Sequence, residues 1–464
     1  MNARDSGPAN GGVSFWWQQI GIPTPRPALD GDLDCDVCIV GGGLTGLWTA
    51  YYLAALDPTL DIVVLEAEFA GFGASGRNGG WLSAELSGSK ERYGATHGAE
   101  GVRALVASME QAVDEVMAVC ADEGIDADIV KDGVLYIARS PAQLSRLREG
   151  LESDASWGIG DQHQRELTRD EVERRIHVEG ALGGTFSPHC ARVHPAKLVS
   201  GVATAVERRG VRIYEKTRAT RIESGVVTTD RGRVTASRVL RCLEGYTAAM
   251  PGQRRTWLPM NSAMIVTEPL PGDVWASIGW QGAELLGDYA NAYCYAQRTA
   301  DGRIALGGRG IPYRFGSRTD IDGQTQDWTI DSLTQILHTM FPATRRAGIE
   351  HAWCGVLGVP RDWCASVTFD PTAGLGWAGG YVGSGLTTTN LAGRTLADLV
   401  LGRDSDLVRL PWVNRAIRKW EPEPFRWLGV RAMYGLYREA DRREDKGSAR
   451  PSRLARIGDR LTGR

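Results

Sequence analysis

The chain has 464 residues, which is long enough for two domains and a large core. Its hydrophobic content of 42%, charged content of 23% and formal net charge of -3 are ordinary for a soluble globular protein, and they give no reason to expect nucleic acid or a membrane as partner. No apolar run approaches the roughly 18 to 20 residues of a membrane span, and no secretory signal is recognisable. The eight cysteines show no repeated spacing, so we expect free thiols and a cytoplasmic protein.

The stretch CDVCIVGGGLTGLWTAYYL, residues 35–53, allows two interpretations. Cys35 and Cys38 have the spacing of a redox or metal-binding pair, whereas the glycines after them have the spacing of a phosphate-binding turn. The β-branched residues within 37–40 predict a short buried strand. On a strand, residues i and i+3 lie about 10 Å apart on opposite faces, beyond the roughly 7 Å that a disulfide tolerates. We therefore predict that both cysteines are ordinary strand residues.

Three glycines stand between this strand and a helix predicted over residues 44–56. Gly41 permits the tight turn, Gly43 lets a pyrophosphate approach the backbone, and Gly46 lets the helix pack against the strand. The helix N-terminus offers unpaired N–H groups and a partial positive charge to the phosphates. A second buried strand ends at Glu66, whose carboxylate suits a ribose 2′-OH. The combination predicts a dinucleotide-binding site.

Two further glycine-rich segments favour FAD over NAD. GFGASGRNGGW, residues 71–81, is expected to run beside the pyrophosphate and ribityl chain of an extended flavin dinucleotide, and the alternative is a plain surface loop. In residues 374–402, glycines precede a helix that is expected to begin near Leu386 or Thr387. Its N-terminus would face the flavin pyrimidine edge, and the alternative is an ordinary capped helix. Only one complete Gly-x-Gly-x-x-Gly unit is followed by an acid, so a second site for NADPH is not expected.

The segment 194–223 predicts a helix, a strand and a turn into another strand. Just before it, in SPHCARVHP, His189, Cys190 and His194 come closest to a metal site. We favour a loop that leads into a helix starting at Pro195 over a zinc site, so no metal is predicted.

In four blocks the sequence resembles the D-amino-acid-oxidase-like superfamily of FAD-dependent oxidoreductases. The blocks are CIVGGGLTGLWTAYYLA with Glu66, GASGRNGGW, the HPAKL…EKTRATRI segment and AGGYVGSGLTTTNLAGRTLAD. Within the superfamily, GASGRNGG, the N-terminal SFWWQQIG and the C-terminal block are most similar to the gamma-glutamylputrescine-oxidase-like amine oxidases. The resemblance implies an α/β fold, in which a Rossmann-type FAD-binding domain is joined to a second α+β substrate domain built on an antiparallel sheet.

The domains implied in this way are discontinuous. We expect an N-terminal extension (1–34), an FAD-binding domain (35–110, 190–250 and 346–405), a substrate domain (111–189 and 251–345) and a C-terminal helical tail (406–464). In the substrate domain, DGVLYIA, NSAMIVTEP, NAYCYAQ and GRIALGG have the pattern of strands. The tail is expected to form one or two amphipathic helices after Pro422 and Pro424, which dock on the body or on a partner subunit.

The resemblance also implies which residues meet FAD. They are Gly41, Gly43, Leu44, Thr45, Gly46, Glu66, Ala67, Gly73, Ala74, Ser75, Gly76, Arg77, Asn78, Gly79, Gly80, Ala219, Gly383, Gly385, Leu386 and Thr387. Glu244 departs from the family pattern, because relatives have small residues at that position beside the cofactor. Cys354 lies near the position where some relatives attach FAD covalently but is offset by one, so we expect non-covalent FAD.

The substrate is expected to bind between the flavin and the antiparallel sheet. Trp353, Trp81 and Tyr293 are candidates for an aromatic cage around a cationic amine, and a core position is the alternative for each. Arg309 and Arg361 are candidates for binding a substrate carboxylate, with a structural or surface role as the alternative. Some relatives use a lysine near the flavin for oxygen activation, whereas GGRGIPYRFGSR offers only arginines, which weakens the case for dioxygen as acceptor.

We predict an enzyme that oxidises a C–N bond in a small primary or secondary amine. Hydride passes to flavin N5, the imine is hydrolysed, and O2 or another acceptor reoxidises the flavin, with O2 giving H2O2. An oxidase or dehydrogenase of an amino acid or hydroxy acid is the first alternative. A flavin-binding subunit without turnover is the alternative from another class of protein.

Overall fold

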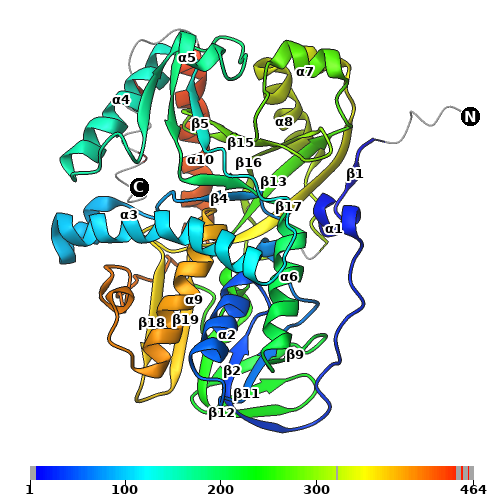
Figure 1. The fold of residues 1–464 in the computed structure, drawn as a ribbon, viewed down its shortest axis with the longest axis vertical. Coiled ribbons are helices and arrows are strands. Elements are labelled where there is room, and N and C mark those ends of the chain that lie inside the picture. Colours follow the sequence, from blue (N-terminus) through cyan, green and yellow to red (C-terminus); the bar gives the residue numbers. More distant parts are fainter. Residues whose placement is uncertain (1–6, 320–321, 446–450, 453–457, 459–464) are drawn as a thin grey trace, which may run out of the picture.

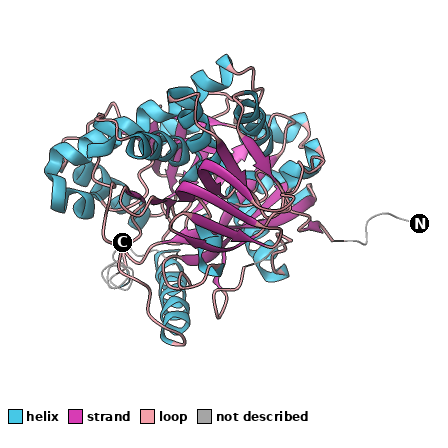
Figure 2. Ribbon diagram, turned by 90° about the horizontal axis from the view of Figure 1, so that it is seen from below, coloured by secondary structure: helices cyan, strands magenta, loops and turns pink. Residues whose placement is uncertain are grey.

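The computed structural model describes residues 7–319, 322–445, 451–452 and 458. Two large sheets form the centres of its two halves, with the eight-stranded sheet in the lower half of Figure 1 and the nine-stranded sheet in the upper half. Figure 2 shows the strands running through the middle of the molecule with helices around them. The fold is therefore the α/β architecture with a second sheet-based unit that was predicted.

The eight-stranded sheet contains the predicted strand–turn–helix. Its strands are β10 (Ala219–Glu223), β11 (Val226–Thr229), β12 (Arg233–Arg241), β2 (Leu33–Val40), β3 (Ile62–Leu65), β9 (Arg212–Tyr214), β19 (Leu375–Gly379) and β18 (Ser366–Asp370). The run β9–β3–β2–β12–β19 is parallel throughout. Cys35 and Cys38 both lie on β2 and are unpaired, which confirms them as strand residues.

Ten helices are described, and three of them pack together beside this sheet. The helices are α1 (Phe15–Ile20), α2 (Leu44–Leu56), α3 (Lys90–Asp122), α4 (Pro141–Ser156), α5 (Arg169–Glu173), α6 (Pro195–Arg208), α7 (Gly272–Ile278), α8 (Asp327–Met340), α9 (Gly385–Leu401) and α10 (Phe425–Asp445). Helix α2 packs against α6 and α9 and is buried on nearly all sides, which explains its Leu- and Ala-rich sequence. At the contact with α9, a Cβ on Gly393 would lie 2.7 Å from the Cβ of Trp48, so only glycine permits this approach.

The nine-stranded sheet is largely antiparallel, as predicted. In spatial order its strands are β1 (Ala9–Asn10), β17 (Ile349–Val359), β13 (Leu258–Thr267), β16 (Ile304–Tyr313), β15 (Cys294–Arg298), β14 (Leu285–Asp288), β5 (Val134–Ala138), β7 (Gly183–Ser187) and β6 (Arg165–Thr168). The pairs β1–β17 and β14–β5 are parallel, and the others are antiparallel. Helices α4, α5, α7 and α8 lie in the same half of the molecule (Figure 1).

Two segments lie differently from the predicted domain limits. The limit at residue 110 falls inside α3, whose buried side chains join the same apolar core as α2 and α9. Strand β17, which was expected in the FAD-binding domain, pairs with β13 in the nine-stranded sheet. The reason is that long-range strand pairing, rather than a local pattern, decides which sheet a strand joins.

Both ends of the described chain are tied to the body. Helix α1 buries Phe15, Trp16 and Trp17. In α10, the Glu444 carboxylate accepts hydrogen bonds of 2.7 and 2.8 Å from Arg146. Helix α10 of the tail thus docks on the half that contains the nine-stranded sheet. Within the described ranges, we find no helix with the length and apolar character needed to cross a membrane.

The remaining elements are short. They are the antiparallel pair β4 (Trp81–Ser83) and β8 (Cys190–Arg192), and the 3-10 helices η1 (Ala74–Gly76), η2 (Glu244–Ala249), η3 (Pro342–Arg346) and η4 (Asp406–Arg409). Of these, η1, η2 and β4 border the cavities described next.

Candidate cofactor and substrate site

An elongated cavity opens at the carboxyl ends of the parallel strands. Gly41 follows β2, Glu66 follows β3 and Leu243 follows β12, and all three line the cavity. At its far end the lining includes Gly383 and Leu386, at the start of α9. This is the edge at which parallel α/β sheets bind their ligands.

The geometry of the turn between β2 and α2 explains why the motif has glycine at these positions. Gly41 has a φ of +115°, and a Cβ there would lie 2.4 Å from the carbonyl oxygen of Cys242 on β12's end. A Cβ on Gly46 would lie 2.1 Å from the carbonyl oxygen of Gly41. Helix α2 begins after Gly43, which has no side chain to cap it. The Leu44 N–H donates to Ser75, and the remaining first-turn N–H groups beside the cavity are suited to phosphate.

Glu66 holds the other side of this turn. Its carboxylate accepts hydrogen bonds from the N–H groups of Gly42 at 2.8 Å and Glu68 at 2.9 Å. Burial raises the pKa of Glu66, while these two hydrogen bonds act in the opposite direction. Glu66 borders the cavity where the ribose of the dinucleotide is expected.

The second glycine-rich segment, residues 71–81, lies along the same cavity, with η1 at its centre. We call it the flavin segment, because it is expected beside the flavin. Ser75 accepts a hydrogen bond of 2.8 Å from the N–H of Leu44, which joins this segment to the start of α2. Asn78 folds back, donating to the Ser75 carbonyl and accepting from the Gly80 N–H, both at 2.8 Å. A Cβ on Gly76 would lie 2.4 Å from the Gly71 carbonyl oxygen, so the glycines of this segment serve close backbone approach.

Glu244 lines the cavity and connects three segments of the chain. Its carboxylate accepts hydrogen bonds from the N–H groups of Gly380 at 2.8 Å, Gly358 at 3.1 Å and Tyr381 at 3.3 Å. Burial raises the pKa of Glu244 to about 7, although the three hydrogen bonds oppose the shift. The residue that departs from the family pattern thus ties the end of β17 to the segment before α9.

Most residues expected at FAD line this cavity. They are Gly41, Gly43, Leu44, Thr45, Glu66, Ala67, Gly73, Ala74, Ser75, Asn78, Ala219, Gly383, Gly385 and Leu386. Arg77 and Gly79 instead line the adjoining pocket. The others, Gly46, Gly76, Gly80 and Thr387, are buried behind the lining. The start of α2, the open cavity and the glycine backbones together fit a dinucleotide.

A second pocket shares part of its lining with the cavity, including Ala74, Asn78, Gly383 and Leu386. One wall consists of aromatic rings from β4, from β5 and from β15 with the residue just before it. They belong to Trp81, Tyr136, Tyr293 and Tyr295.

Centroid distances between neighbouring rings of this wall are close to 6 Å. They are 5.9 Å for Trp81–Tyr295, 6.0 Å for Trp81–Tyr136 and 6.4 Å for Tyr293–Tyr295. Trp81 and Tyr293 were expected here, whereas Tyr136 was missed, although its place on the strand pattern DGVLYIA was the available signal.

Of the other two substrate candidates, one lies in the core and the side chain of the other is not described. Trp353 is fully buried in the core, where its indole N–H donates to the Arg77 carbonyl oxygen at 2.8 Å and its ring packs against Phe15 and Trp16. It therefore supports the flavin segment from behind and does not line the pocket. Arg309 is a residue of β16, and its side chain lies outside the described part of the structure.

Arg361 and Cys354 have structural partners. Arg361 forms an ion pair of 3.1 Å with Glu421. The Cys354 thiol lies 3.3 Å from the Gln324 carbonyl oxygen, and Cys354 lines neither the cavity nor the aromatic pocket. His194 caps α6, which begins at Pro195 as predicted. Groups of three or more potential metal ligands do not occur among the described residues.

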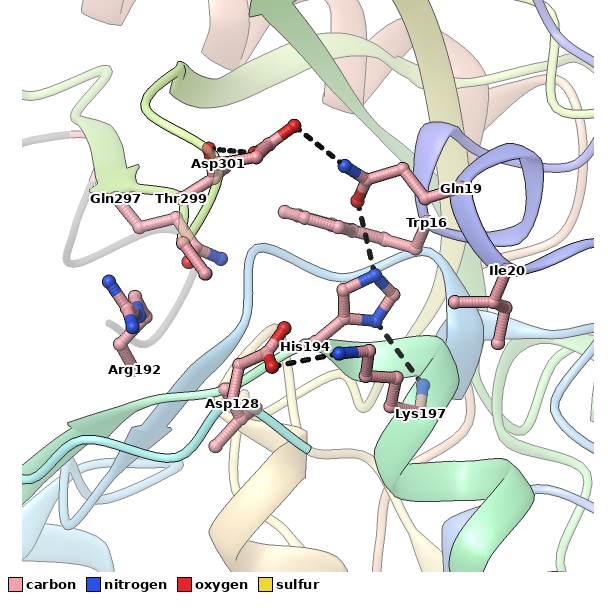
Figure 3. Close-up of a pocket in the computed structure, with 12 residues that line it drawn as sticks. Trp16, Gln19, Ile20, Asp128, Arg192, His194, Lys197, Gln297, Thr299 and Asp301 are labelled. Atoms are coloured by element: carbon pink, nitrogen blue, oxygen red, sulfur yellow. Dashed lines mark hydrogen bonds and ion pairs between the residues drawn. The ribbon is translucent and has the colours of Figure 1, made fainter. Parts of the chain in front are cut away.

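A third, polar pocket is lined mainly by residues of α1, of α6 and the residues before it, and of β15 and the residues after it (Figure 3). Its polar groups are largely bonded to each other: Lys197 pairs with Asp128 at 2.8 Å, and Gln19 joins His194 at 3.1 Å to Asp301 at 2.9 Å. Burial lowers the pKa of His194 to about 4, so its ring is neutral near pH 7. Its Nδ1 accepts from the Lys197 N–H, and therefore Nε2 donates to Gln19.

Two residues of this pocket hold the flavin segment in place. The Trp16 indole N–H donates to the Asn78 carbonyl oxygen at 2.8 Å. The Gln297 amide donates to the Gly79 carbonyl oxygen at 2.7 Å. The segment expected beside the flavin is thus fixed from outside by α1 and β15.

Comparison with known proteins agrees with this geometry. Residues 36–399 match the model of the FAD dependent oxidoreductase family. The chain is 30% identical to gamma-glutamylputrescine oxidoreductase of Escherichia coli (strain K12) over 82% of its own length and 86% of that protein. It is 25% identical to glycine oxidase of Geobacillus kaustophilus, over 79% and 92% of the two chains.

Solved structures have the same fold. The crystal structure of glycine oxidase from Geobacillus kaustophilus superposes with a TM-score of 0.68 at 21% identity, covering 83% of this chain and 100% of that one. L-proline dehydrogenase from P. horikoshii superposes with a TM-score of 0.67 at 16% identity, covering 83% and 98%. From the family match and the site together, the chain belongs to the FAD dependent oxidoreductase family and is an enzyme that uses FAD.

Proposed function

We propose that the protein oxidises the C–N bond of a small primary or secondary amine in the aromatic pocket. The observation that carries this proposal is the wall of four rings, Trp81, Tyr136, Tyr293 and Tyr295, beside the flavin cavity. Aromatic faces attract a cation and also offer an apolar surface to an alkyl chain, which together suit an amine. Two relatives are named for nitrogen compounds, gamma-glutamylputrescine and glycine, which supports the same class of bond.

The charges of the pocket favour an amine over an amino acid. Among the described lining residues, Arg77 is the one guanidinium. Its Nε–H donates to the Phe72 carbonyl oxygen at 2.7 Å, and the guanidinium carbon lies 4.4 Å from the centre of the Phe72 ring. Because Arg77 is turned into the protein in this way, a substrate carboxylate would lack a cationic partner among these residues.

In the proposed mechanism the protein binds and orients the amine. FAD, when bound, supplies a hydride acceptor. The ring faces attract the ammonium as it approaches, and the amine then loses a proton to solvent because burial disfavours an ammonium. The aromatic wall keeps water from the reacting carbon. With its lone pair free, the nitrogen assists hydride loss from the α-carbon, so no side-chain base is required.

The net reaction follows from this assignment. A primary amine, O2 and water give an aldehyde, ammonia and H2O2, with O2 proposed as the electron acceptor. We also propose a cytoplasmic location, which is supported by the eight cysteines, all of which are free.

The test is an anaerobic absorbance spectrum of the purified flavoprotein before and after addition of pooled amines or pooled amino acids. We expect the flavin bands to bleach with the amine pool and ammonia to form in air. Bleaching with the amino-acid pool alone would replace the amine by an amino acid as the substrate. Flavin that stays oxidised with every donor would indicate a binding subunit without turnover.

A further inference from the structure

The polar pocket of Figure 3 is large enough for a ligand of its own. Its volume is about 370 Å³, which lies within the range of small-molecule sites. Its lining, all of which belongs to the described residues, has no member in common with the flavin cavity or the aromatic pocket. The charged side chains of this lining are Asp128, Arg192, Lys197 and Asp301. The pocket is therefore a separate space with charged groups at its surface.

Arg192 differs from the other charged residues of the polar pocket, because they are all paired. Lys197 forms an ion pair of 2.8 Å with Asp128, and Asp301 forms one of 2.6 Å with Arg303. Among the residues that the structure describes, no carboxylate lies within ion-pair distance of the Arg192 guanidinium. The lining thus contains one cation whose charge is not matched by an acid.

The Arg192 guanidinium is half-buried and lies across the pocket from the His194 ring (Figure 3). It donates to the Arg298 carbonyl oxygen at 3.2 Å, while its buried Nε–H has no acceptor in the described part of the chain. Burial lowers the pKa of Arg192, because desolvation disfavours the charged form. Arginine nevertheless keeps its charge near pH 7, so this guanidinium is a partly desolvated cation with unused donors. A carboxylate is the group that matches it best, through two parallel hydrogen bonds.

Residues of the polar pocket also hold the flavin segment at three consecutive carbonyl oxygens, those of residues 78–80. The first two oxygens accept from Trp16 and Gln297, and the third accepts from the Val193 N–H at 2.9 Å. Arg192 itself lies on β8, the strand that pairs with β4 at the end of this segment. A ligand bound among these groups therefore restrains the backbone beside the flavin cavity.

We propose that the polar pocket is an effector site in which Arg192 binds the carboxylate of a small organic acid. The two carboxylate oxygens accept from the guanidinium, and the apolar part of the ligand lies against Ile20 and Val193, which line the same pocket. The bound acid stabilises the flavin segment, because it binds only while the residues that hold this segment are in place. The site takes no part in the oxidation and does not depend on which substrate is oxidised.

The experiment measures binding of butanoate to the oxidised holoenzyme by isothermal titration calorimetry at constant ionic strength. Butanamide is the uncharged probe of the same shape. The wild type should bind butanoate at least about tenfold more tightly than butanamide, and Arg192→Gln should remove this difference, because it removes the charged donor. Butanoate bound in the aromatic pocket would be retained by the variant, so the difference between the two proteins reports the polar pocket.

Two further variants separate the pocket from general effects of charge. Arg148→Gln removes an equal charge from an exposed ion pair with Glu166, outside the pocket lining, and should leave both affinities unchanged. Ala300→Glu places a carboxylate at an exposed position of the lining while Arg192 is kept, and it should weaken the binding of butanoate but not of butanamide. This variant tests the site even if Arg192→Gln does not fold.

A second measurement addresses the flavin segment. The temperature at which flavin is released, followed by flavin fluorescence, should rise with butanoate in the wild type and in Arg148→Gln, but not in Arg192→Gln. Absence of butanoate binding to the wild type, or equal affinity in Arg192→Gln, overturns the site. Binding that leaves the release temperature unchanged overturns the link to the flavin segment. None of these readouts involves turnover, so the proposed function can fail while this inference stands, and the reverse.

Discussion

Replacing Glu244 with glutamine should change how stability depends on pH. In the folded protein the pKa of Glu244 is raised from 4.5 to about 7 by burial, so the folded state binds this proton more tightly than the unfolded state. The stabilisation from protonation is complete below pH 4.5 and is lost as the pH rises through about 7. A shift of this size corresponds to roughly 3 kcal/mol, and screening on the cavity side reduces the expectation to about 2 kcal/mol.

The glutamine of the Glu244→Gln variant cannot titrate, so this pH-dependent part of the free energy of unfolding disappears. A separate, constant cost of about 1–3 kcal/mol is expected, because the amide N–H group of glutamine faces one of the backbone donors that the carboxylate accepts from Gly358, Gly380 and Tyr381. The diagnostic quantity is therefore the slope of the difference between the two proteins with pH, rather than its value at one pH.

The assay is urea unfolding of both flavin-free proteins, followed by tryptophan fluorescence between about pH 5 and pH 8. The wild-type free energy of unfolding should fall relative to the variant by about 2 kcal/mol over this range. All other titrating groups are common to the two proteins and cancel in the difference. A difference that stays flat across the range would refute the reasoning that Glu244 carries a raised pKa.

Three further outcomes follow from the cofactor site. Gly46→Ala should lower the free energy of unfolding by more than about 3 kcal/mol and abolish flavin retention, because the new Cβ would lie 2.1 Å from the Gly41 carbonyl oxygen. A stable variant that still binds flavin would contradict this packing argument. Glu66→Ala should weaken FAD binding by about tenfold in a titration of the flavin-free protein, since it removes a charged acceptor; an unchanged Kd would place the ribose elsewhere. Acid precipitation should release all flavin from the wild type and from Cys354→Ala alike, and flavin left in the wild-type pellet would indicate a covalent bond to the thiol.

The sequence was sufficient where the determining interactions are local. The order strand, glycine turn and helix was predicted, and α2 has the predicted limits, residues 44–56, because the glycine turn and the apolar run lie next to each other. Helix α10 begins at Phe425, directly after the proline pair, for the same reason. The strand patterns of the antiparallel sheet were also recognisable from alternation and β-branched residues.

The features that sequence reasoning missed depend on contacts between distant segments. Trp353 has an aromatic side chain of the kind that can form a cage. Its indole N–H, however, donates to the Arg77 carbonyl oxygen 276 positions earlier, which places the ring in the core. The structural role of Glu244 was not predicted, because its three backbone partners come from two other parts of the chain. Which side of a strand meets a cavity is set by sheet pairing, and pairing partners are not encoded in one segment.

The position of the N-terminal strand affects when the protein can finish folding during its synthesis. Strand β1 pairs with β17, and the His351 imidazole donates to the Gly11 carbonyl oxygen, 340 residues away along the chain. At roughly 5–20 residues per second, a ribosome needs on the order of 17–70 s to make that stretch. Throughout this interval the apolar side chains of Phe15, Trp16 and Trp17 have no completed core to enter. Residues 9–17 are thus secured only after β17 has been made, long after their own synthesis.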